Sequence, residues 1–236
     1  AYPPQIMLRE DGKADGLEAD LIRALERETG LQVEWQLGSW ADAVLKLRNR
    51  QVEIIPGMNV TAERKREFLF TRPYFEDRVV LFVAHDSYHI VGLADLRDRR
   101  VGIQKGEVAG QLLRQQRPGL NYYEYDSQRE LLQAVAEREI DAAAANYYAG
   151  KYWLRRADLE KQVKTNGESL FVNPFAIAVR ADDPELMAQL DNALARLENS
   201  GELQRIKDKW LGETATFWGL SRQQLINYAV VVLILA

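Results

Sequence analysis

The stretch PGMNVTAERKREFLFTRPYF, residues 56–75, combines the features that decide the fold. It follows an apolar run that predicts a strand over 52–55. The pair Pro56-Gly57 is typical of a turn, and the charged run ERKR follows at 63–66. Thr61 is placed to cap a short helix. A strand end, a helix start and clustered positive charge together indicate an anion-binding site.

Composition bounds the class of protein. The 236 residues are enough for one large domain or two lobes, and 47% of them are hydrophobic. The formal net charge is −4, from 31 basic and 35 acidic residues that are well mixed, which argues against a nucleic-acid-binding surface. The absence of cysteine excludes disulfides and thiolate metal sites. The two histidines, His85 and His89, lie in a loop-like stretch, so we expect surface histidines and no metal site.

Helical and strand patterns alternate in the first part of the chain. Residues 16–29 place three leucines and an alanine on one helical face, and Gly30 is a C-terminal stop. Alternation over 31–36 predicts a short strand. Ser39 and Asp42 then resemble a capping box at a helix start. This αβαβ order favours a parallel sheet with helices on its faces.

A second unit repeats the alternation. The pattern predicts strands at 100–104, 121–125 and 140–144, helices at 107–116 and 127–138, an extended stretch at 170–180, and helices at 184–199 and 202–210. No Gly/Ser linker separates the two units. We therefore expect two lobes joined by extended segments near 76–80 and 171–176.

Two strand ends are candidate binding positions, since ligands of open α/β sheets bind beyond the carboxyl ends of strands. After the first, the backbone of Gly57-Met58-Asn59 and the guanidinium of Arg64 could bind a carboxylate. A solvated charged helix explains the same spacing. After the second, the turn at 105–108 lacks the Walker spacing and resembles an ordinary strand–helix turn. No catalytic triad, GxSxG motif or metal-ligand cluster indicates an enzyme.

Segments spread in order along almost the whole chain resemble the class-3 bacterial extracellular solute-binding proteins. They are Tyr2-Pro3-Pro4 with DGKADGLEADLIRAL, Trp40, PGMNVTAERKREFLFTRPYF, DLRDRRVGIQKG, EREIDAAAANYYAGKYWL and LENSGELQRIKDKWLG. The resemblance implies an α/β, two-lobed periplasmic-binding-protein type II fold, or Venus flytrap, in which each lobe is a mostly parallel sheet flanked by helices. Residues 1–78 and 174–216 would form lobe 1, and residues 79–173 lobe 2.

The resemblance also implies ligand contacts from lobe 1. Arg64 would bind the α-carboxylate of an amino acid, helped by the backbone at Gly57 and by Asn59. Tyr2 and Trp40 match aromatic positions that sandwich the ligand side chain, which favours a basic side chain. Core packing is the alternative explanation for both aromatic residues.

From lobe 2, the resemblance implies contacts at Glu107, Val108 and Asn146. Glu107 and Val108 stand where the family usually carries Ser and Thr. Asn146 stands where amino-acid binders carry an Asp for the α-ammonium, so it brings a hydrogen-bond acceptor without the charge. Glu107 could supply the missing charge, or it could be a helix N-terminal carboxylate stabilised by the helix dipole.

Beyond KDKWLG, the sequence predicts a juxtamembrane segment over 217–227 and the start of a truncated transmembrane helix over 228–236. The final AVVVLILA is uninterrupted by polar residues, and Trp218 and Tyr228 flank it as interfacial aromatics would. A buried C-terminal strand is the alternative. The chain also begins without an initiator methionine, which suggests that an upstream segment has been removed.

These features predict the periplasmic ligand-sensing domain of an inner-membrane protein. Lobe closure on an amino acid would pass through the membrane helix to a cytoplasmic histidine kinase or cyclic di-GMP enzyme. We expect no catalysis in this domain, no cofactor, no metal and no nucleic-acid partner; a homodimer of the full-length protein is compatible with this interpretation. Three alternatives stay open: a binding domain fused to an ABC amino-acid permease, a dehydratase with Glu107 as general acid, and a flytrap that has lost its ligand.

Overall fold

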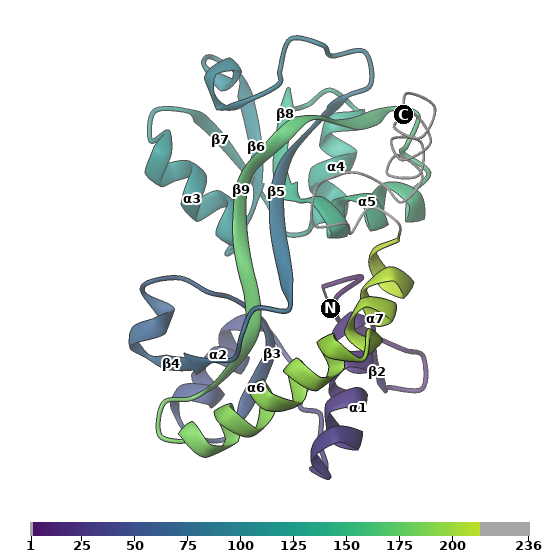
Figure 1. Ribbon diagram of the computed structural model, residues 1–236. Helices are drawn as coiled ribbons and strands as arrows, with labels where there is room; N and C mark the ends of the chain where they lie inside the picture. Colours follow the sequence, from purple (N-terminus) through teal and green to yellow (C-terminus); the bar gives the residue numbers. More distant parts are fainter. Residues whose placement is uncertain (1, 213–236) are drawn as a thin grey trace, which may run out of the picture. The chain divides into compact units, whose positions relative to one another are not determined.

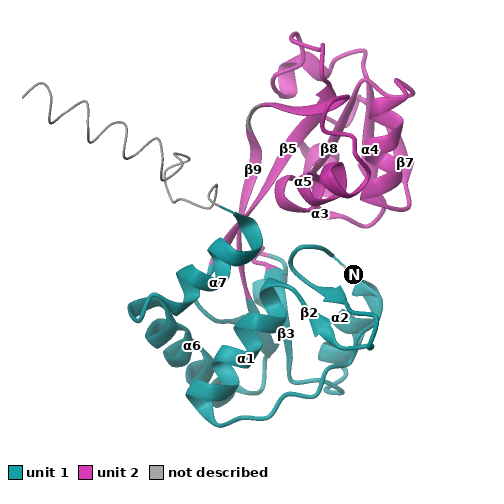
Figure 2. Cartoon of the chain, turned by 90° about the vertical axis from the view of Figure 1, so that its right-hand side faces the viewer, with its two compact units in different colours: residues 1–58, 63–74, 177–236 teal, residues 59–62, 75–176 magenta. Residues whose placement is uncertain are grey.

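The computed structural model describes residues 2–212, which form two compact units (Figures 1 and 2). Among the described residues, the first unit comprises 2–58, 63–74 and 177–212, and the second comprises 59–62 and 75–176. The chain therefore changes unit after Met58, Ala62, Tyr74 and Ala176. The lobe boundaries expected from the sequence stay a prediction.

The expected juxtamembrane segment and membrane helix, 217–227 and 228–236, lie outside the described residues. Within residues 2–212, no helix combines the length and the apolar character needed to cross a membrane. The membrane segment therefore stays a prediction from the sequence.

The first unit packs helices against short strands. Its elements are β1 (Met7–Leu8), β2 (Ala14–Asp15), α1 (Leu17–Thr29), α2 (Trp40–Arg48), β3 (Ile54–Asn59), the 3-10 helix η1 (Arg64–Arg66), β4 (Phe68–Phe70), α6 (Pro184–Asn199) and α7 (Glu202–Leu211). The last residues of β9 (Val163–Arg180) also belong to it and pair antiparallel with β4. The helices predicted in this part of the chain are confirmed. The apolar face of α1 is buried as expected, and Gly30 ends the helix in the left-handed conformation.

The N-terminus of α1 is capped by backbone carbonyls from an earlier loop. The N-cap residue, Gly16, has no side chain to accept a hydrogen bond. Instead the N–H of Leu17 donates to the carbonyl of Pro4 at 3.1 Å, and the N–H of Glu18 donates to that of Gln5 at 2.9 Å. A Cβ on residue 16 would lie 2.6 Å from the Gln5 oxygen, so only glycine fits this close approach.

The strand predicted over 31–36 is wrong. Side chains there alternate between half-buried and exposed, but no ladder forms. The N–H of Val33 instead donates to the Glu26 carboxylate at 2.8 Å, so a side chain of α1 takes the place of a neighbouring strand. The alternation reflects a segment lying along a helix rather than one paired in a sheet.

Two details of the 56–75 stretch also differ from the prediction. The expected turn at Pro56-Gly57 lies inside β3, where Gly57 takes a φ of 78° and lets the strand bend and continue. The short helix begins later than expected, since Glu63 and not Thr61 occupies the N-cap position of η1.

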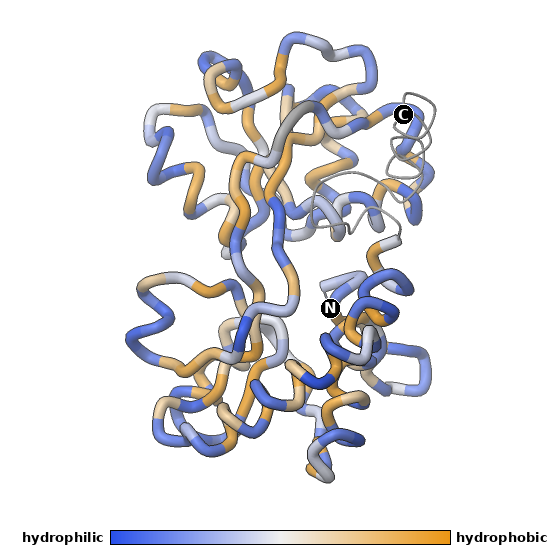
Figure 3. Tube along the Cα trace, in the orientation of Figure 1, coloured by the Kyte–Doolittle hydropathy of each residue, from blue (hydrophilic) through white to orange (hydrophobic). Residues whose placement is uncertain are grey.

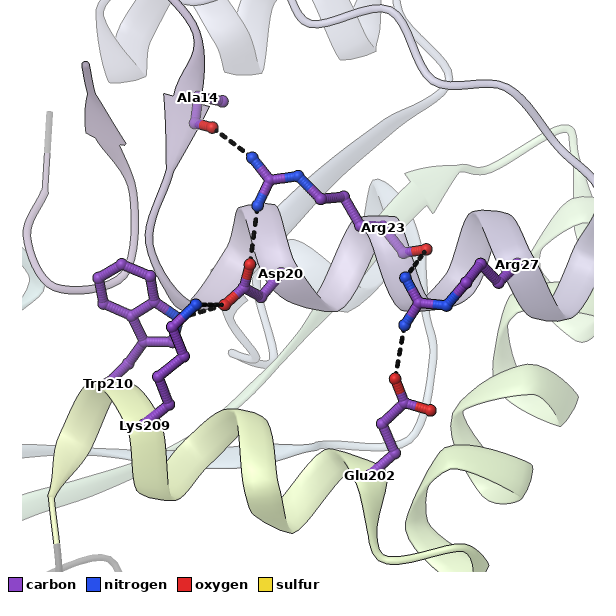
Figure 4. Close-up of polar contacts among 7 residues, drawn as sticks. All are labelled: Ala14, Asp20, Arg23, Arg27, Glu202, Lys209 and Trp210. Carbon is purple, nitrogen blue, oxygen red and sulfur yellow. Dashed lines mark hydrogen bonds and ion pairs between the residues drawn. The ribbon is translucent and has the colours of Figure 1, made fainter. Parts of the chain in front are cut away.

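Helix α7 is held on α1 by polar contacts near both of its ends (Figure 4). One carboxylate oxygen of Asp20 accepts hydrogen bonds from Lys209 Nζ at 2.6 Å and from Trp210 Nε1 at 2.7 Å. A second link joins Arg27 of α1 to Glu202 of α7 at 2.5 Å. These contacts fix the two ends of α7 against one helix.

The second unit is a mixed sheet with helices on both faces. Its elements are β5 (Phe75–Ala84), the 3-10 helix η2 (Leu93–Leu96), β6 (Arg100–Gln104), α3 (Val108–Gln116), β7 (Asn121–Tyr125), α4 (Gln128–Ala136), β8 (Ala142–Asn146), α5 (Tyr147–Arg156) and most of β9. The strand order is β9-β5-β8-β6-β7. Strand β6 runs parallel to β7 and β8, whereas β5 runs antiparallel to β8 and β9.

Alternate residues of the central strands enter two separate cores. Phe82 of β5 lies in the core under α4 and α5, and Leu81 lies in the core under α3. Residues 79–84 of β5, VVLFVA, are all hydrophobic, and this part of the strand is orange in Figure 3. Gly150 of α5 packs directly on the Phe82 ring, which leaves no space for a Cβ. This two-sided burial requires the continuous apolar strands that the sequence contains.

The alternation predicted for the second unit is confirmed, although β9 begins at Val163, earlier than the extended stretch expected at 170–180. Strand β8 ends at Asn146, two residues beyond the expected strand end. Helix α5 was not predicted. It begins directly after β8, and Asn146 caps it by accepting a hydrogen bond from the Ala149 N–H at 2.9 Å. No turn residues separate the two elements, so no local signal marks the boundary.

Candidate ligand-binding site

In the first unit, the structure brings Arg64 and Trp40 together. The guanidinium carbon of Arg64 lies 5.2 Å from the centroid of the Trp40 ring, a cation–π distance. Arg64 is half-buried, while Trp40 is 43% exposed. Burial lowers the pKa of Arg64 and neighbouring Glu63 opposes this shift, but a guanidinium remains charged at neutral pH. The result is a partly desolvated cation beside an accessible aromatic ring.

The local sequence positions this pair. Ser39 caps α2 through a hydrogen bond that its hydroxyl accepts from the Asp42 N–H at 3.1 Å, and this places Trp40 at the first helical residue. At the other end of α2, Arg48 donates to both carboxylate oxygens of Glu67, which follows η1. This bidentate contact holds α2 against the turn that carries Arg64.

Tyr2 and Gly57, also expected at the site, lie in the same unit. The main chain of Tyr2 pairs with Ile6 through hydrogen bonds of 2.8 and 2.9 Å, and the Tyr2 side chain is half-buried. Gly57 bends β3 two residues before Asn59. The ligand contacts expected of Tyr2 and Gly57 stay predictions.

In the second unit, the structure brings Asn59 and Asn146 together on a carboxylate, Asp77 of β5. Asn59 Nδ2 donates to Asp77 Oδ2 at 3.1 Å, and Asn146 Nδ2 donates to Asp77 Oδ1. Asp77 and Asn146 are each only 1% exposed. The Asn146 oxygen also caps α5, so the polar atoms of this side chain both have protein partners.

Asp77 is a buried acid without a counter-charge in the described chain. Burial raises the pKa of Asp77 to about 6, although the hydrogen bond from Asn59 lowers it. The carboxyl is therefore mostly ionised at neutral pH. Within residues 2–212, its hydrogen-bond partners are two neutral amides, and no Lys, Arg or His forms an ion pair with it.

The adjacent cation, Arg78, is engaged elsewhere. Its guanidinium carbon lies 4.8 Å from the Tyr147 ring centroid and 5.3 Å from that of Tyr148, and it donates to the Tyr148 hydroxyl at 3.0 Å. Burial raises the pKa of Tyr148, and Arg78 opposes the shift. Neighbouring residues of a strand point to opposite faces, which explains why Arg78 does not neutralise Asp77.

The remaining two expected residues lie at the start of α3. Glu107 occupies the N-cap position, but its carboxylate accepts hydrogen bonds from Gln128 Nε2 at 3.1 and 3.2 Å instead of capping the helix. Val108 is the first helical residue. Glu107 also lines an open cavity of about 460 Å³ that runs along α3 as far as Gln115.

Asp77 was not among the residues predicted from the sequence, although a signal for it exists. In Phe75-Glu76-Asp77-Arg78-Val79, alternate residues share one face of a strand. Asp77 therefore falls on the same face as two large apolar residues, and the structure buries all three. An acid at an inward position of an apolar strand is a candidate functional group.

A family model described as bacterial extracellular solute-binding proteins, family 3, matches residues 1–213. The chain belongs to this family. Among relatives, ABC transporter arginine-binding protein 1 of Escherichia coli (strain K12) is 27% identical over 212 residues, which cover 89% of this chain and 86% of the relative. Membership of the family confirms the expected two-lobed α/β periplasmic-binding-protein fold.

Two solved structures resemble this family-3 protein over most of its length. A histidine kinase sensor domain with similarity to periplasmic binding proteins matches with a TM-score of 0.82 at 28% identity, covering 89% of this chain and 92% of that one. An ancestral arginine-binding protein bound to arginine matches with a TM-score of 0.78 at 28% identity, covering 89% and 94%.

The described residues of this solute-binding protein thus include two candidate groups, one in each unit. The first is the guanidinium–indole pair of Arg64 and Trp40, and the second is the carboxylate of Asp77 with its two asparagines. Within residues 2–212, no group of three or more His, Asp and Glu side chains is arranged to hold a metal ion. One group can bind an anion and the other can attract a cation.

Proposed function

We propose that this chain binds a free α-amino acid, preferably one with a basic side chain. The observation that carries the proposal is the half-buried Arg64 guanidinium on the exposed Trp40 ring. A guanidinium offers two parallel N–H groups that match a carboxylate, and partial desolvation strengthens the pair. Relatives named as arginine-binding proteins support the ligand class.

The exposed part of Trp40 supports the preference for a basic side chain. With 43% of the residue accessible, the ring can contact a ligand in addition to Arg64. A ligand cation on an aromatic face contributes roughly 0.5–2 kcal/mol. We propose Tyr2 as a second aromatic contact.

A thermal-shift panel of the standard amino acids, followed by calorimetric titration with L-arginine, tests this function. Basic amino acids are expected to raise the melting temperature most. An unchanged melting temperature across the panel would refute the proposal.

Arg64→Ala is expected to weaken L-arginine binding by about 10- to 100-fold, because the carboxylate loses charge-assisted hydrogen bonds. Arg66→Ala is the matched control, since Arg66 is an exposed arginine in the same 3-10 turn. Equal affinities in both variants would remove Arg64 from the site.

We further propose that the domain senses its ligand in the periplasm for an inner-membrane signalling protein. The similarity to a histidine kinase sensor domain supports this over a permease fusion. Helix α7, fixed to α1 by Asp20 and Arg27, is the element that would carry the response towards a membrane segment at 228–236.

The full-length protein in membranes tests the sensing role. Addition of L-arginine is expected to change the activity of a cytoplasmic output module. L-arginine uptake without any change in such an activity would favour a transport role.

A further inference from the structure

The buried carboxylate of Asp77 is incompletely neutralised in this structure. Each of its oxygens accepts a hydrogen bond from an asparagine amide, one from Asn59 and one from Asn146. Amides stabilise a carboxylate without cancelling its charge. A buried charge without an opposite charge is costly, and proteins keep such groups chiefly where a ligand, metal or partner supplies the counter-charge.

The surrounding groups do not supply that charge. Arg78 is stacked on Tyr147 and Tyr148 and hydrogen-bonded to the Tyr148 hydroxyl. No cluster of three or more potential metal ligands forms among the described residues 2–212. A small organic cation therefore remains the best candidate.

We propose that Asp77 supplies the negative charge that recognises the ammonium group of the bound amino acid. The inference rests on the proposed function and deepens it, because it assigns the ammonium-recognising charge to β5. Asn59 and Asn146 act as positioning residues that orient and hold the carboxylate. In this proposal Asn146 supports the charge, because its Nδ2 donates to the Asp77 carboxylate.

Glu107, the other acid considered for recognition of the ligand ammonium, fits this role less well. Both Glu107 oxygens accept hydrogen bonds from one Gln128 amide, and Glu107 faces the cavity along α3. Glu107 is half-buried, whereas Asp77 is buried, so a charge at 77 acts through a lower local dielectric. The carboxylate with the stronger field is Asp77.

The first test compares Asp77→Asn with Glu76→Gln by titration with L-arginine. Glu76 is the matched control, because it is the exposed acid one residue earlier on the same strand. Asp77→Asn is expected to weaken binding by about 10- to 100-fold, and Glu76→Gln by less than about twofold. Apo melting curves verify that both variants fold. Wild-type affinity in a folded Asp77→Asn variant would overturn the inference.

A second test distinguishes an electrostatic role from a structural one. The analogue 5-guanidinopentanoate keeps the carboxylate and guanidinium of L-arginine but lacks the α-ammonium. Wild-type protein is expected to prefer L-arginine over this analogue by about 10-fold or more, and Asp77→Asn is expected to lose the preference. An undiminished preference in Asp77→Asn would overturn the inference.

The third test moves the charge. The double variant Asp77→Asn with Asn146→Asp exchanges the two groups, so that the acid stands at position 146 and the amide at position 77 of the same contact. It is expected to regain at least about tenfold of the lost affinity. Failure of this folded variant to regain any affinity would count against a role for the charge. If wild-type protein binds no amino acid at all, the proposed function falls and this inference falls with it.

Discussion

Two buried carboxyl groups, Glu18 and Asp77, have pKa values raised towards neutral pH. Glu18 of α1 is 1% exposed, and the Tyr74 hydroxyl donates to its Oε2 at 2.6 Å. Burial raises the pKa of Glu18 to about 8, although the Tyr74 hydrogen bond lowers it. Glu18 is thus mostly protonated at neutral pH, whereas Asp77 is mostly ionised.

Glu18 should make the folded protein less stable as pH rises from about 4.5 to about 8. In this window the unfolded chain has released the proton and the folded chain retains it, so the free energy of unfolding falls with pH. The slope from one proton is at most about 1.4 kcal/mol per pH unit. Urea unfolding of wild type and Glu18→Gln across a pH series from mildly acidic to mildly basic measures it.

The Glu18→Gln variant is expected to lose the fall of the free energy of unfolding with pH that Glu18 causes. It keeps a hydrogen-bond acceptor for Tyr74. All other titrating groups are shared, so the difference between the two proteins isolates Glu18. Parallel pH dependences would show that Glu18 titrates alike in the folded and unfolded states.

Ligand affinity is expected to decrease as the pH drops below about 6, because Asp77 becomes protonated. Protonation removes the charge proposed to attract the ligand ammonium, with a limiting loss of about tenfold per pH unit. The groups facing it are the amides of Asn59 and Asn146, which do not titrate, and the Tyr148 hydroxyl on α5, whose pKa is raised by burial. Calorimetry between roughly pH 5 and pH 7 on wild type and Asp77→Asn should show a pH dependence only in the wild type.

Among single residues, those with a local signature are predictable from the sequence, whereas a contact between distant strands is not. Arg64 and Trp40 each stand at a helix start, and the structure places them in contact. The cluster of Asp77, Asn59 and Asn146 joins three strands far apart in the sequence. No spacing rule predicts such a contact before the strand order is known.

Among the helices and strands, the contact between α1 and α7 can be tested through Asp20. Asp20 accepts hydrogen bonds from Lys209, Trp210 and Arg23. Burial alone would raise the pKa of Asp20, but these donors outweigh it and lower the pKa. Ionised Asp20 therefore stabilises the folded protein at pH values above the pKa that Asp20 has in the unfolded chain, and this stabilisation is lost on strong acidification.

Asp20→Asn is expected to destabilise the protein by about 1.5–3 kcal/mol at neutral pH, because charged partners lose their acceptor. Asp208→Asn, an exposed change on α7 itself, is the control and should cost less than about 0.5 kcal/mol. Urea midpoints compare the two. Equal midpoints would show that Asp20 does not hold α7.

Gly150→Ala tests the close packing of α5 on β5. A Cβ at this position would overlap the Phe82 ring, so we expect a loss of about 1–3 kcal/mol. Gly119→Ala is the control, since no atom lies within 4 Å of the position that its Cβ would take. A Gly150→Ala variant as stable as wild type would show that the Phe82 ring can move to accommodate the added methyl group.

Element positions were predictable where the sequence contains caps and periodicity, as in α2 with Ser39 and α6 with Asp183 before Pro184. They were not predictable where a tertiary contact replaces local structure, as at Val33, whose N–H bonds a side chain of α1. Helix α5 follows β8 without a break, so no turn signal separates them.

At the scale of the whole molecule, the order of motifs along the chain predicted the family and the two-lobed fold. Membership of family 3 over residues 1–213 confirms both. The sequence favoured a mostly parallel sheet in each lobe, whereas in the second unit β5 runs antiparallel to β8 and β9. Chain direction in a sheet depends on long connections that local patterns do not encode.

A crystal structure of this protein grown with L-arginine tests whether Arg64 holds the ligand carboxylate. We expect the α-carboxylate to accept two hydrogen bonds from the Arg64 guanidinium at about 2.7–2.9 Å. A bound L-arginine whose carboxylate is held by other groups, with Arg64 contacting neither of its oxygens, would contradict the account.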